Sequence, residues 1–512
     1  MRIHPVGTRA LLLDLDGLDQ VMAWHAALSQ RPLKNQVDCI AAATTVLLTF
    51  EAPMSATAAA EHLKDFTPPA HRVEEPRTVD IDVLYDGEDL DEVAGLMGIS
   101  REGVIDWHTS TTWTAAFGGF APGFTYCVAA DGKDARSVPR RSNPRTAVPA
   151  GAVGIAGEFS AVYPRTSPGG WQLLGRTSTP MWNSHAQPPA LVQPGDRVRY
   201  RAVDSLPEFI DDDAAAQRTP PRLPRLRVED AGLLTLYQDL GRPGRGDLGV
   251  SPSGAADRAA AATANIAVGN ARGDTVLENI GGMTLTALTD TVIAVTGALC
   301  KVTLGGYPVH LARPILVTAG QTVRIHRAEA GMRSYVAVRG GIVADIELGS
   351  SATDVLSGLG PDPVKVGDVI GTMPFSRGNT DTQLSNPLRV RQEGRTTTAV
   401  LRCVAGPRDD WFAKGAAALT ESTWTVSPDS NRVGLRFDAE TVIERSREGE
   451  LPSEGMVAGS IQVPPNGKPV VFMRDHAVTG GYPVIATVLD EDMDIAAQLP
   501  PGARVTFDLV GE

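Results

Sequence analysis

Three stretches of the chain share one short pattern, and this repeat constrains the fold more than any other feature. A turn with glycine leads through one polar residue into alternating Val-x-apolar in LVQPGDRVRY (191–200), LVTAGQTVRI (316–325) and QLPPGARVTF (498–507). A second pair, SPGGWQLLGRT (167–177) and VTGGYPVIATV (478–488), places Gly-Gly before an aromatic residue and a strand-like stretch. Alternation with a period of two is typical of strands. The repeats therefore predict three related β-rich units, closed by these strands, that end near residues 205, 370 and 510.

The composition favours antiparallel barrels or sandwiches. The 512 residues include 52 glycines and 37 prolines, whereas aromatic residues make up only 5%. Many short strands joined by tight turns need such a mixture. The predicted fold class is mainly β with a small N-terminal α/β unit, because helix-like and strand-like stretches alternate only near the start of the chain.

The predicted domains follow from these patterns. Residues 1–77 are expected to form the α/β domain, and the β-rich units are expected at 78–205, 227–374 and 388–512. Residues 206–226 are acidic and then proline-rich without apolar periodicity, as in an interdomain linker. A shorter linker, 375–387, separates the last two units. The chain therefore resembles two proteins joined end to end.

Charge and motif content argue against several function classes. A net charge of −13 argues against a nucleic-acid partner, and no apolar run reaches the roughly 18 residues that cross a bilayer. We expect no signal peptide, and the four well-separated cysteines favour a reduced, cytoplasmic protein. The sequence lacks a phosphate loop, HExxH, G-x-S-x-G and a biotin-carrier MKM. No metal site is expected, and candidate sites must be sought among polar residues on glycine-rich turns.

The first half presents such residues in three segments and at His108. FGGFAPGFTYC (117–127) is interpreted as either a structural turn or the wall of a pocket. His108 lies where a helix is expected to end and a strand to begin. It is interpreted either as a base or as a semi-buried histidine whose ring nitrogens are hydrogen-bonded. PRRSNPRT (139–146) groups arginines for anion binding, unless it is a solvated loop or an interface. SPGGWQLLGRT adds backbone amides and Arg176 that suit an oxyanion.

The second half adds carboxylates and further arginines. QDLGRPGRGDLGVSPSGAADR (238–258), LENIGG (277–282), LPSEGMVAGSIQVP (451–464) and DHAVTGGYP (475–483) supply Asp239, Arg242, Ser253, Asp257, Arg258, Glu278, Glu454, Gln462, Asp475, His476, Thr479 and Tyr482. Asp257 begins a helix-like segment, where the helix dipole stabilises an acid whatever its function. Glu454 on its glycine-rich turn is an acid–base candidate.

Longer signatures resemble a known family. FGGFAPGFTY, VPRRSNPRTAVPAGAVGIAGEFSAVYPRTSPGGWQLLGRT and PPALVQPGDRVRY resemble allophanate hydrolase subunit 1, which includes KipI and PxpB. GLLTLYQDLGRPGRGDLGVSPSGAADR, YVAVRGGI, VSPDSNRVGLR and LPSEGMVAGSIQVPPNGKPVVFMRDHAVTGGYP resemble its subunit 2, which includes KipA and PxpC. The resemblance covers most of residues 80–205 and 228–510 in family order. It implies three cyclophilin-like β-barrel domains, one after the α/β unit and two in tandem.

The resemblance also implies a function. Its members form an ATP-dependent 5-oxoprolinase, which cleaves 5-oxo-L-proline to L-glutamate with a PxpA-like partner of the LamB/YcsF family. We therefore expect ATP with Mg²⁺, a small-molecule substrate and no tightly bound cofactor. We expect no nucleic-acid or membrane partner, and a homo-oligomer stays open. The catalytic candidates are His108, Arg176, Asp257, Glu278 and Glu454. The substrate-binding candidates are Arg140, Asn143, Arg145, Ser167, Gly169, Gly170, Gln172, Asp239, Arg242, Gln462 and Tyr482.

Two alternatives stay open at this point. One is the carboxyltransferase component of a biotin-dependent urea or amide carboxylase, which would need a separate carrier and a separate biotin carboxylase. The other is a regulator of a histidine kinase, as KipI and KipA are. For the 5-oxoprolinase hypothesis we expect the functional cleft between the two halves, with Arg176 and Glu454 facing it, because binding clefts commonly form where domains meet.

Overall fold

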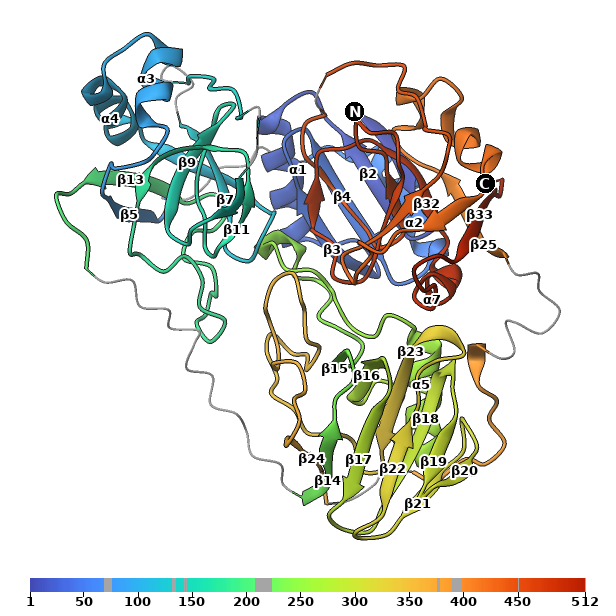
Figure 1. Ribbon diagram of the computed structural model, residues 1–512. Coiled ribbons are helices and arrows are strands. Elements are labelled where there is room, and N and C mark those ends of the chain that lie inside the picture. Colours follow the sequence, from blue (N-terminus) through green and yellow to red (C-terminus); the bar gives the residue numbers. More distant parts are fainter. Residues whose placement is uncertain are drawn as a thin grey trace.

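The computed structural model describes residues 1–68, 76–130, 135–141, 143, 145–207, 223–374, 378–388, 398–449 and 451–511. The described residues form a small α/β domain followed by three β-rich domains (Figure 1), which confirms the predicted fold class. Most of the segment 206–226, predicted to be a linker, lies outside the described residues, and strand β14 already begins at Leu223.

The first domain is a four-stranded antiparallel sheet in the order β1-β2-β4-β3. Its elements are β1 (Arg2–Val6), β2 (Ala10–Asp14), α1 (Leu18–Gln30), β3 (Gln36–Ala41), β4 (Thr45–Phe50) and α2 (Pro53–Lys64). In β2, Leu11 and Leu13 pack in the core that includes the helices, whereas Leu12 packs with Val478 of the last domain. Both faces of the sheet are therefore buried, which accounts for the unbroken apolar run in β2.

The second domain is a seven-stranded sheet in the order β12-β9-β10-β7-β6-β13-β5, with a two-stranded ribbon β11-β8 beside it. Its elements are β5 (Thr78–Val83), α3 (Leu90–Met97), α4 (Arg101–Ser110), β6 (Trp113–Gly118), β7 (Thr125–Ala129), β8 (Arg145–Val148), β9 (Ala152–Ala156), β10 (Phe159–Val162), β11 (Ser167–Gly169), β12 (Gln172–Arg176) and β13 (Arg197–Ala202). Ser100 caps α4 by accepting a hydrogen bond from the Gly103 amide (3.1 Å).

The third domain packs two sheets, in the orders β20-β19-β22-β17-β14-β24 and β15-β16-β23-β18-β21, with α5 against the second. Its elements are β14 (Leu223–Asp230), β15 (Leu234–Gln238), the 3₁₀ helix η2 (Gly246–Leu248), α5 (Arg258–Val268), β16 (Val276–Ile280), β17 (Met283–Ala287), β18 (Thr291–Leu299), β19 (Val302–Leu304), β20 (Tyr307–Val309), β21 (Ile315–Val317), β22 (Thr322–Ile325), β23 (Ala330–Val338) and β24 (Val369–Thr372).

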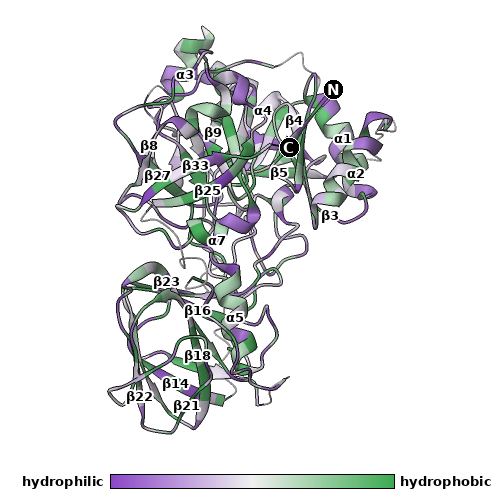
Figure 2. Cartoon of the chain, turned by 90° about the vertical axis from the view of Figure 1, so that its right-hand side faces the viewer, coloured by the Kyte–Doolittle hydropathy of each residue, from purple (hydrophilic) through white to green (hydrophobic). Residues whose placement is uncertain are grey.

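The fourth domain is a closed barrel in the order β25-β32-β29-β30-β27-β26-β33, with a ribbon β28-β31 beside it. Its elements are β25 (Thr398–Ala405), η3 (Asp409–Trp411), η4 (Gly415–Glu421), β26 (Trp424–Val426), β27 (Gly434–Asp438), β28 (Glu454–Gly455), β29 (Ser460–Gln462), β30 (Val470–Phe472), β31 (Thr479–Gly480), β32 (Val484–Val488), η5 (Asp490–Asp492), α7 (Met493–Ala496) and β33 (Arg504–Leu509). Alternate residues of β33 are buried, and Figure 2 shows hydrophobic and hydrophilic residues interleaved along the strands.

The repeats mark equivalent strands in two of the three β-rich domains. The closing strands β13 and β33 each pair in parallel with the opening strand of their domain, with Arg197 opposite Thr78 and Arg504 opposite Thr398. Residues 316–325 are different, because they form the end of β21 and the interior strand β22. The third domain instead ends with β24, near the predicted residue 370. The prediction that 316–325 closes a unit is therefore wrong, since the pattern marks a glycine turn before a half-buried strand anywhere in a sheet.

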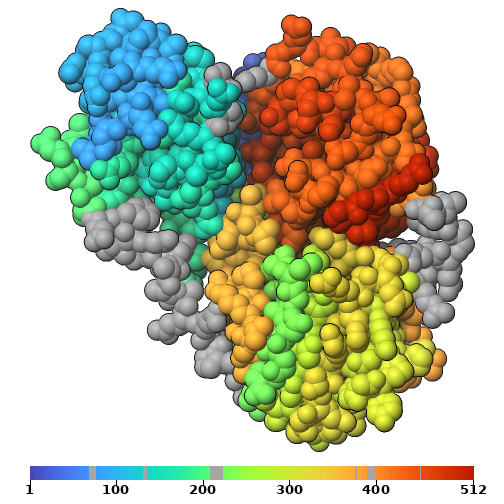
Figure 3. Space-filling view, viewed as in Figure 1, coloured from blue at the N-terminus to red at the C-terminus, as the bar shows by residue number. Residues whose placement is uncertain are grey.

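Sequence order does not give the arrangement in space. The first domain lies against the fourth rather than at the far end of the molecule (Figure 1). Residues between β23 and β24 lie where the second, third and fourth domains meet (Figure 3). Leu359 of this segment packs with Trp182 of the second domain, and the Val355 amide donates to Asp475 of the fourth (3.1 Å). The two halves are therefore interlocked.

Candidate functional site

The segment Phe117–Cys127 joins the two halves of the chain. Its aromatic side chains pack inside the second domain, as in the stacked pair of Phe117 and Tyr126 (ring centroids 4.5 Å apart). Two of its glycines face the other half instead, because a Cβ at Gly118 would lie 2.2 Å from the Asp247 carbonyl oxygen and a Cβ at Gly119 would lie 3.0 Å from the Thr479 side chain. The Gly123 amide also donates to the carbonyl of Leu248 (3.1 Å). Of the two interpretations left open, the structure supports a close-packed interdomain turn.

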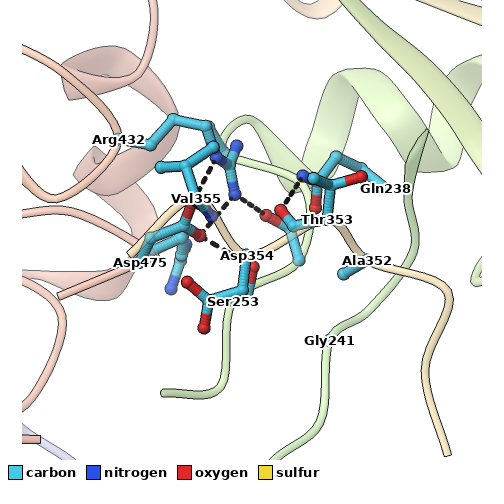
Figure 4. Close-up of polar contacts among 12 residues, drawn as sticks. Gln238, Gly241, Ser253, Ala352, Thr353, Asp354, Val355, Arg432 and Asp475 are labelled. Atoms are coloured by element: carbon cyan, nitrogen blue, oxygen red, sulfur yellow. Dashed lines mark hydrogen bonds and ion pairs between the residues drawn. The ribbon is translucent and has the colours of Figure 1, made fainter. Parts of the chain in front are cut away.

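A buried ionic cluster holds the third and fourth domains together. Arg432, in the loop before β27, donates to Glu278 Oε1 of β16 (2.6 Å) and to both carboxylate oxygens of Asp475 (2.8 and 2.9 Å). All three side chains are at most 2% exposed. Figure 4 shows Arg432 and Asp475 facing Ser253 and Asp354 of the third domain. The Ser253 hydroxyl donates to Asp475 Oδ1 (2.7 Å).

The cluster extends from Glu278 along the N-terminus of α5. Tyr335 donates its hydroxyl proton to Glu278 Oε2 (2.9 Å) and accepts the Asp257 amide (2.8 Å). Asp257 caps α5 by accepting the Ala260 amide (2.9 Å), and its other oxygen accepts from Gln498 (2.9 Å). The structure thus brings the predicted catalytic candidates Asp257 and Glu278 close together, but inside an interdomain contact.

Opposing charges set the protonation of this cluster. Burial alone would raise the pKa of Glu278, but the guanidinium groups of Arg432 and Arg333 bring it below its ordinary value. Burial, followed by the charge of Asp475, raises the pKa of Asp354. The cluster therefore combines structural ion pairs with one titratable acid.

Other predicted catalytic candidates lie elsewhere. His108 is fully buried in the second domain, where its Nδ1 and Nε2 contact the hydroxyls of Tyr85 (2.7 Å) and Ser160 (2.9 Å), and burial lowers its pKa to about 3. Arg176 is exposed and donates to Asp86 (2.9 Å). Glu454 was expected to face an open cleft, but it does not. It is 2% exposed and accepts from Arg408, which also binds Asp14.

The predicted substrate-binding residues are dispersed. In the second domain, Arg145 binds Glu88 and Asp89, and Gln172 donates to Glu92. In the ribbon region, Ser167 donates to the Arg165 carbonyl, a Cβ at Gly169 would clash with Tyr163, and the Gly170 carbonyl accepts from the Arg141 amide. Arg140 and Asn143 are exposed. In the second half, Asp239 accepts from Ser350, Arg242 donates to the carbonyls of Glu347 and Ala352, and Gln462 donates to the carbonyl of the half-exposed Tyr482. Asp239 and Arg242 thus hold residues 347–352, between β23 and β24, in place. The candidate residues of the second domain do not contact Asp239 or Arg242 in any of these bonds.

A cavity of about 510 Å³ opens where the first, third and fourth domains meet. Its walls include the apolar side chains of Val6, Ile40, Val250, Val457 and Val478. Its polar lining includes Arg9, Asp38, Arg258, His476 and Asp490. A cavity between the halves therefore exists, where the functional cleft was predicted, but of the residues singled out from the sequence only Arg258 and His476 line it. Sequence reasoning missed Arg9, Asp38 and Asp490 entirely, and no motif marks them.

Asp38 and His476 are among the groups in this cavity with shifted pKa values. Burial raises the pKa of Asp38 to about 6, although the Gly246 amide donates to its Oδ2 (3.0 Å). Burial lowers the pKa of His476 to about 4, so the imidazole is neutral at physiological pH. Because the Ala477 carbonyl can only accept, His476 Nδ1 (2.9 Å away) carries the proton and Nε2 is an acceptor. The cavity thus contains one buried acid and one neutral imidazole beside its arginines.

Metal binding and membrane crossing find no support in the described parts of the chain. No group of three or more His, Cys, Asp or Glu side chains among the described residues is arranged to hold a metal ion. Within the described ranges, no helix combines the length and the hydrophobicity needed to cross a bilayer.

Comparison with known proteins places the two halves. A family described as carboxyltransferase domain, subdomain C and D, matches residues 1–192, and subdomain A and B matches residues 248–509. Two relatives are the 5-oxoprolinase subunits B and C of Escherichia coli, from O157:H7 and from strain K12 respectively. The chain is 35% identical to the first over 208 residues, which are 39% of this chain and 94% of that protein. It is 35% identical to the second over 287 residues, which are 55% of this chain and 90% of that protein.

A solved structure matches both halves together. The crystal structure of TTHA0988 superposes with a TM-score of 0.85 at 33% identity and covers 98% of this chain and 99% of that one. The fused arrangement of the two halves is therefore shared with a protein of known structure. The chain belongs to the carboxyltransferase-domain family that includes 5-oxoprolinase subunits B and C, and it carries both parts on one polypeptide.

Proposed function

We propose that the chain combines the roles of 5-oxoprolinase subunits B and C in an enzyme that opens 5-oxo-L-proline to L-glutamate with hydrolysis of ATP. One observation carries the proposal. A single chain covers nine-tenths or more of each of these two proteins at 35% identity. The interlocking of the halves supports it, because Arg408 of the fourth domain binds Asp14 of the first (2.8 Å).

The chemistry requires energy input. A five-membered lactam is a weak electrophile, so activation by phosphoryl transfer makes attack by water feasible, with cationic side chains stabilising the transferring group. The sequence has no phosphate loop. ATP with Mg²⁺ is therefore held either by arginines and backbone amides of this chain or by a partner. We propose that the partner is a PxpA-like protein of the LamB/YcsF family, and that the chain alone has little activity.

The experiment measures glutamate release from 5-oxo-L-proline with ATP and Mg²⁺. The purified chain, the LamB/YcsF-family protein from the same genome, and their mixture are compared, with omission of ATP as a control. We expect glutamate only from the complete mixture. Background release from the mixture, with both proteins folded and ATP present, would refute the assignment.

The family description keeps carboxyl transfer as a second candidate function. That reaction moves a carboxyl group from carboxybiotin to an amide, and it would require a separate biotin carrier because the chain has no MKM motif. Carboxylation of urea by the chain, supplied with biotin carboxylase and a biotinylated carrier, would favour this candidate. Glutamate release that needs neither biotin nor bicarbonate favours the first.

A further inference from the structure

Three arginines, one from each of three domains, lie around the carboxylate of Asp490 beside the cavity between the first, third and fourth domains, which we call the junction cavity. Arg9 and Arg258 line this cavity, whereas Arg474 does not. Arg9 lies in the turn between β1 and β2, Arg258 is the first residue of α5, and Arg474 follows β30. Arg9 Nη1 lies 3.6 Å from Asp490 Oδ2, and Arg474 Nη1 lies 3.5 Å from Asp490 Oδ1. Arg258 and Asp490 both line the cavity. The three cations thus share Asp490 between them.

Positive charge in this group exceeds what its neighbours compensate. The pKa of Arg258 is lowered to about 10, first by the charge of Arg474 and then by burial. An arginine ordinarily keeps its proton above pH 12, so repulsion between neighbouring arginines has a clear effect here. Burial would raise the pKa of Asp490, but Arg474, Arg258 and Arg9 bring it below its ordinary value.

The nearby acids do not remove this excess. Asp494 attracts Arg258 and offsets part of its charge, while its two oxygens also accept the backbone amides of Arg258 (2.8 Å) and Ala259 (3.3 Å) at the start of α5, yet the pKa of Arg258 stays lowered. Asp38 and Glu51 also line the cavity. Neither is among the main causes of the pKa shifts of Arg258 and Asp490, so both act more weakly there than the arginines do.

Buried donors in the same group lack acceptors. The Nε atoms of Arg9, Arg258 and Arg474 are each buried without a hydrogen-bond partner among the described residues. Buried polar groups of native proteins are nearly always paired, and an orphaned donor commonly indicates an ion or ligand. A carboxylate or phosphate offers several oxygen acceptors and negative charge at once, which matches guanidinium geometry.

We propose that the junction cavity is a binding site for a small oxyanion, with its carboxylate or phosphate held by Arg9 and Arg258, which line the cavity, and with Arg474 adding positive charge through its contact with Asp490. The cavity of about 510 Å³ is within the usual range of about 300–1,000 Å³ for small-molecule sites. The valines and Ile40 on its walls suit a compact apolar body attached to the anionic group. The inference does not rest on the proposed function, because inorganic phosphate alone can test it.

The first experiment measures binding to the full chain by calorimetry, without any partner protein. The probes are inorganic phosphate, 5-oxo-L-proline and ATP, and the neutral control is 2-pyrrolidinone, which has the same ring without the carboxylate. We expect at least one anionic probe to bind and 2-pyrrolidinone not to bind. The identity of the tightest probe separates a carboxylate source from a phosphate source. Equal binding of 2-pyrrolidinone and 5-oxo-L-proline, or no binding of any anion, overturns the proposal.

Substitutions locate the site. Arg258→Gln and Arg9→Gln should each weaken binding of the anion at least about tenfold, as expected for the loss of one charge-assisted contact. Arg199→Gln is the matched control, because Arg199 is an exposed arginine that pairs with Asp80 in the second domain. Unchanged affinity in Arg258→Gln, or an equal loss in Arg199→Gln, contradicts the assignment.

Thermal stability distinguishes a ligand-binding arginine from a structural one. Because Arg474 repels Arg258, Arg258→Gln should melt at the same temperature as the parent or higher when no anion is present. The anion should then raise the melting temperature of the parent and not that of the variant. A lower melting temperature for the anion-free variant would show that Arg258 is structural. If the parent chain binds the anion but the complete mixture with the LamB/YcsF-family protein releases no glutamate, the result counts against the proposed function and leaves this site in place.

Discussion

Replacement of Arg432 by methionine tests the buried cluster most directly. The substitution keeps much of the side-chain volume but removes four contacts, to Glu278, to both oxygens of Asp475 and to the Gly254 carbonyl (2.7 Å). Removal of one partner from a buried ion pair costs about 3–5 kcal/mol, because a carboxylate remains desolvated without its cation. Arg333 still lies 3.4 Å from Glu278, so we expect this range rather than twice its value.

The pH dependence of the loss gives a second criterion. In the parent, Arg432 and Arg333 keep the folded-state pKa of Glu278 below its ordinary value. A carboxylate with a lowered folded-state pKa contributes stability above the unfolded-state value of about 4.3, and this contribution is lost as the pH falls. In Arg432→Met burial dominates, and the pKa of Glu278 rises above the unfolded-state value. The deficit of the variant should therefore be largest near neutral pH and shrink as the pH falls.

Urea unfolding followed by tryptophan fluorescence and circular dichroism measures the effect. Trp424 is buried in the fourth domain and reports its unfolding. Four domains need not unfold in one step, so the midpoint of the fourth-domain transition is compared rather than a global free energy. Arg199→Met, at the surface of the second domain, is the control and should leave that midpoint unchanged. A loss below about 1 kcal/mol, or a deficit that grows at low pH, would refute the reasoning.

Three further variants test other placements. Glu454→Gln should lower the melting temperature of the protein, because Arg408 loses a buried anionic partner at a cost of about 1–3 kcal/mol. An unchanged melting curve with lost partner-dependent glutamate release would instead identify Glu454 as a catalytic acid. His108→Phe should destabilise the second domain yet leave the pH profile of glutamate release unchanged between pH 5 and 8, because the pKa of His108 is about 3; a shifted profile would contradict its structural role. Gly118→Val should loosen the contact between the two halves, because any side chain would meet the Asp247 carbonyl. Size-exclusion chromatography and limited proteolysis measure this loosening, and parent-like resistance to protease would contradict the close packing.

The local patterns of the sequence predicted much of the fold because turns and strands depend on neighbouring residues. The glycine turn before β33 and the alternation within it are both visible in QLPPGARVTF. The same pattern misassigned 316–325 as the closing strand of the third domain, because strand order within a sheet depends on contacts that are distant in sequence. The packing of the first domain on the fourth was also not predictable, since the apolar run of β2 indicates burial on two faces but not the covering domain.

The site was predicted less well for a related reason. Asp257 and Glu278 lie in glycine-rich signatures and are linked in the structure through the Tyr335 hydroxyl. Arg432 lies in VSPDSNRVGLR, a segment that carries the family resemblance, but no neighbouring residue indicates that its side chain is buried between carboxylates. Arg9 is a single cation in a two-strand turn, and nothing local distinguishes it from a solvated arginine. His108 shows the opposite error, since a histidine at a helix end can point either to solvent or into the core, and only the tertiary contacts decide which.

The junction cavity needs both halves of the chain. Arg9 and Asp38 come from the first half, whereas Arg258, His476 and Asp490 come from the second. Neither half alone could therefore form the three-arginine group, and no motif within one half could disclose it. Covalent fusion makes the association of the halves intramolecular, so its effective concentration is set by the connecting segment rather than by expression level. Because Leu12 and Val478 are buried against each other, and Asp14 and Arg408 are paired across the same interface, the fused chain keeps the cavity assembled even at high dilution.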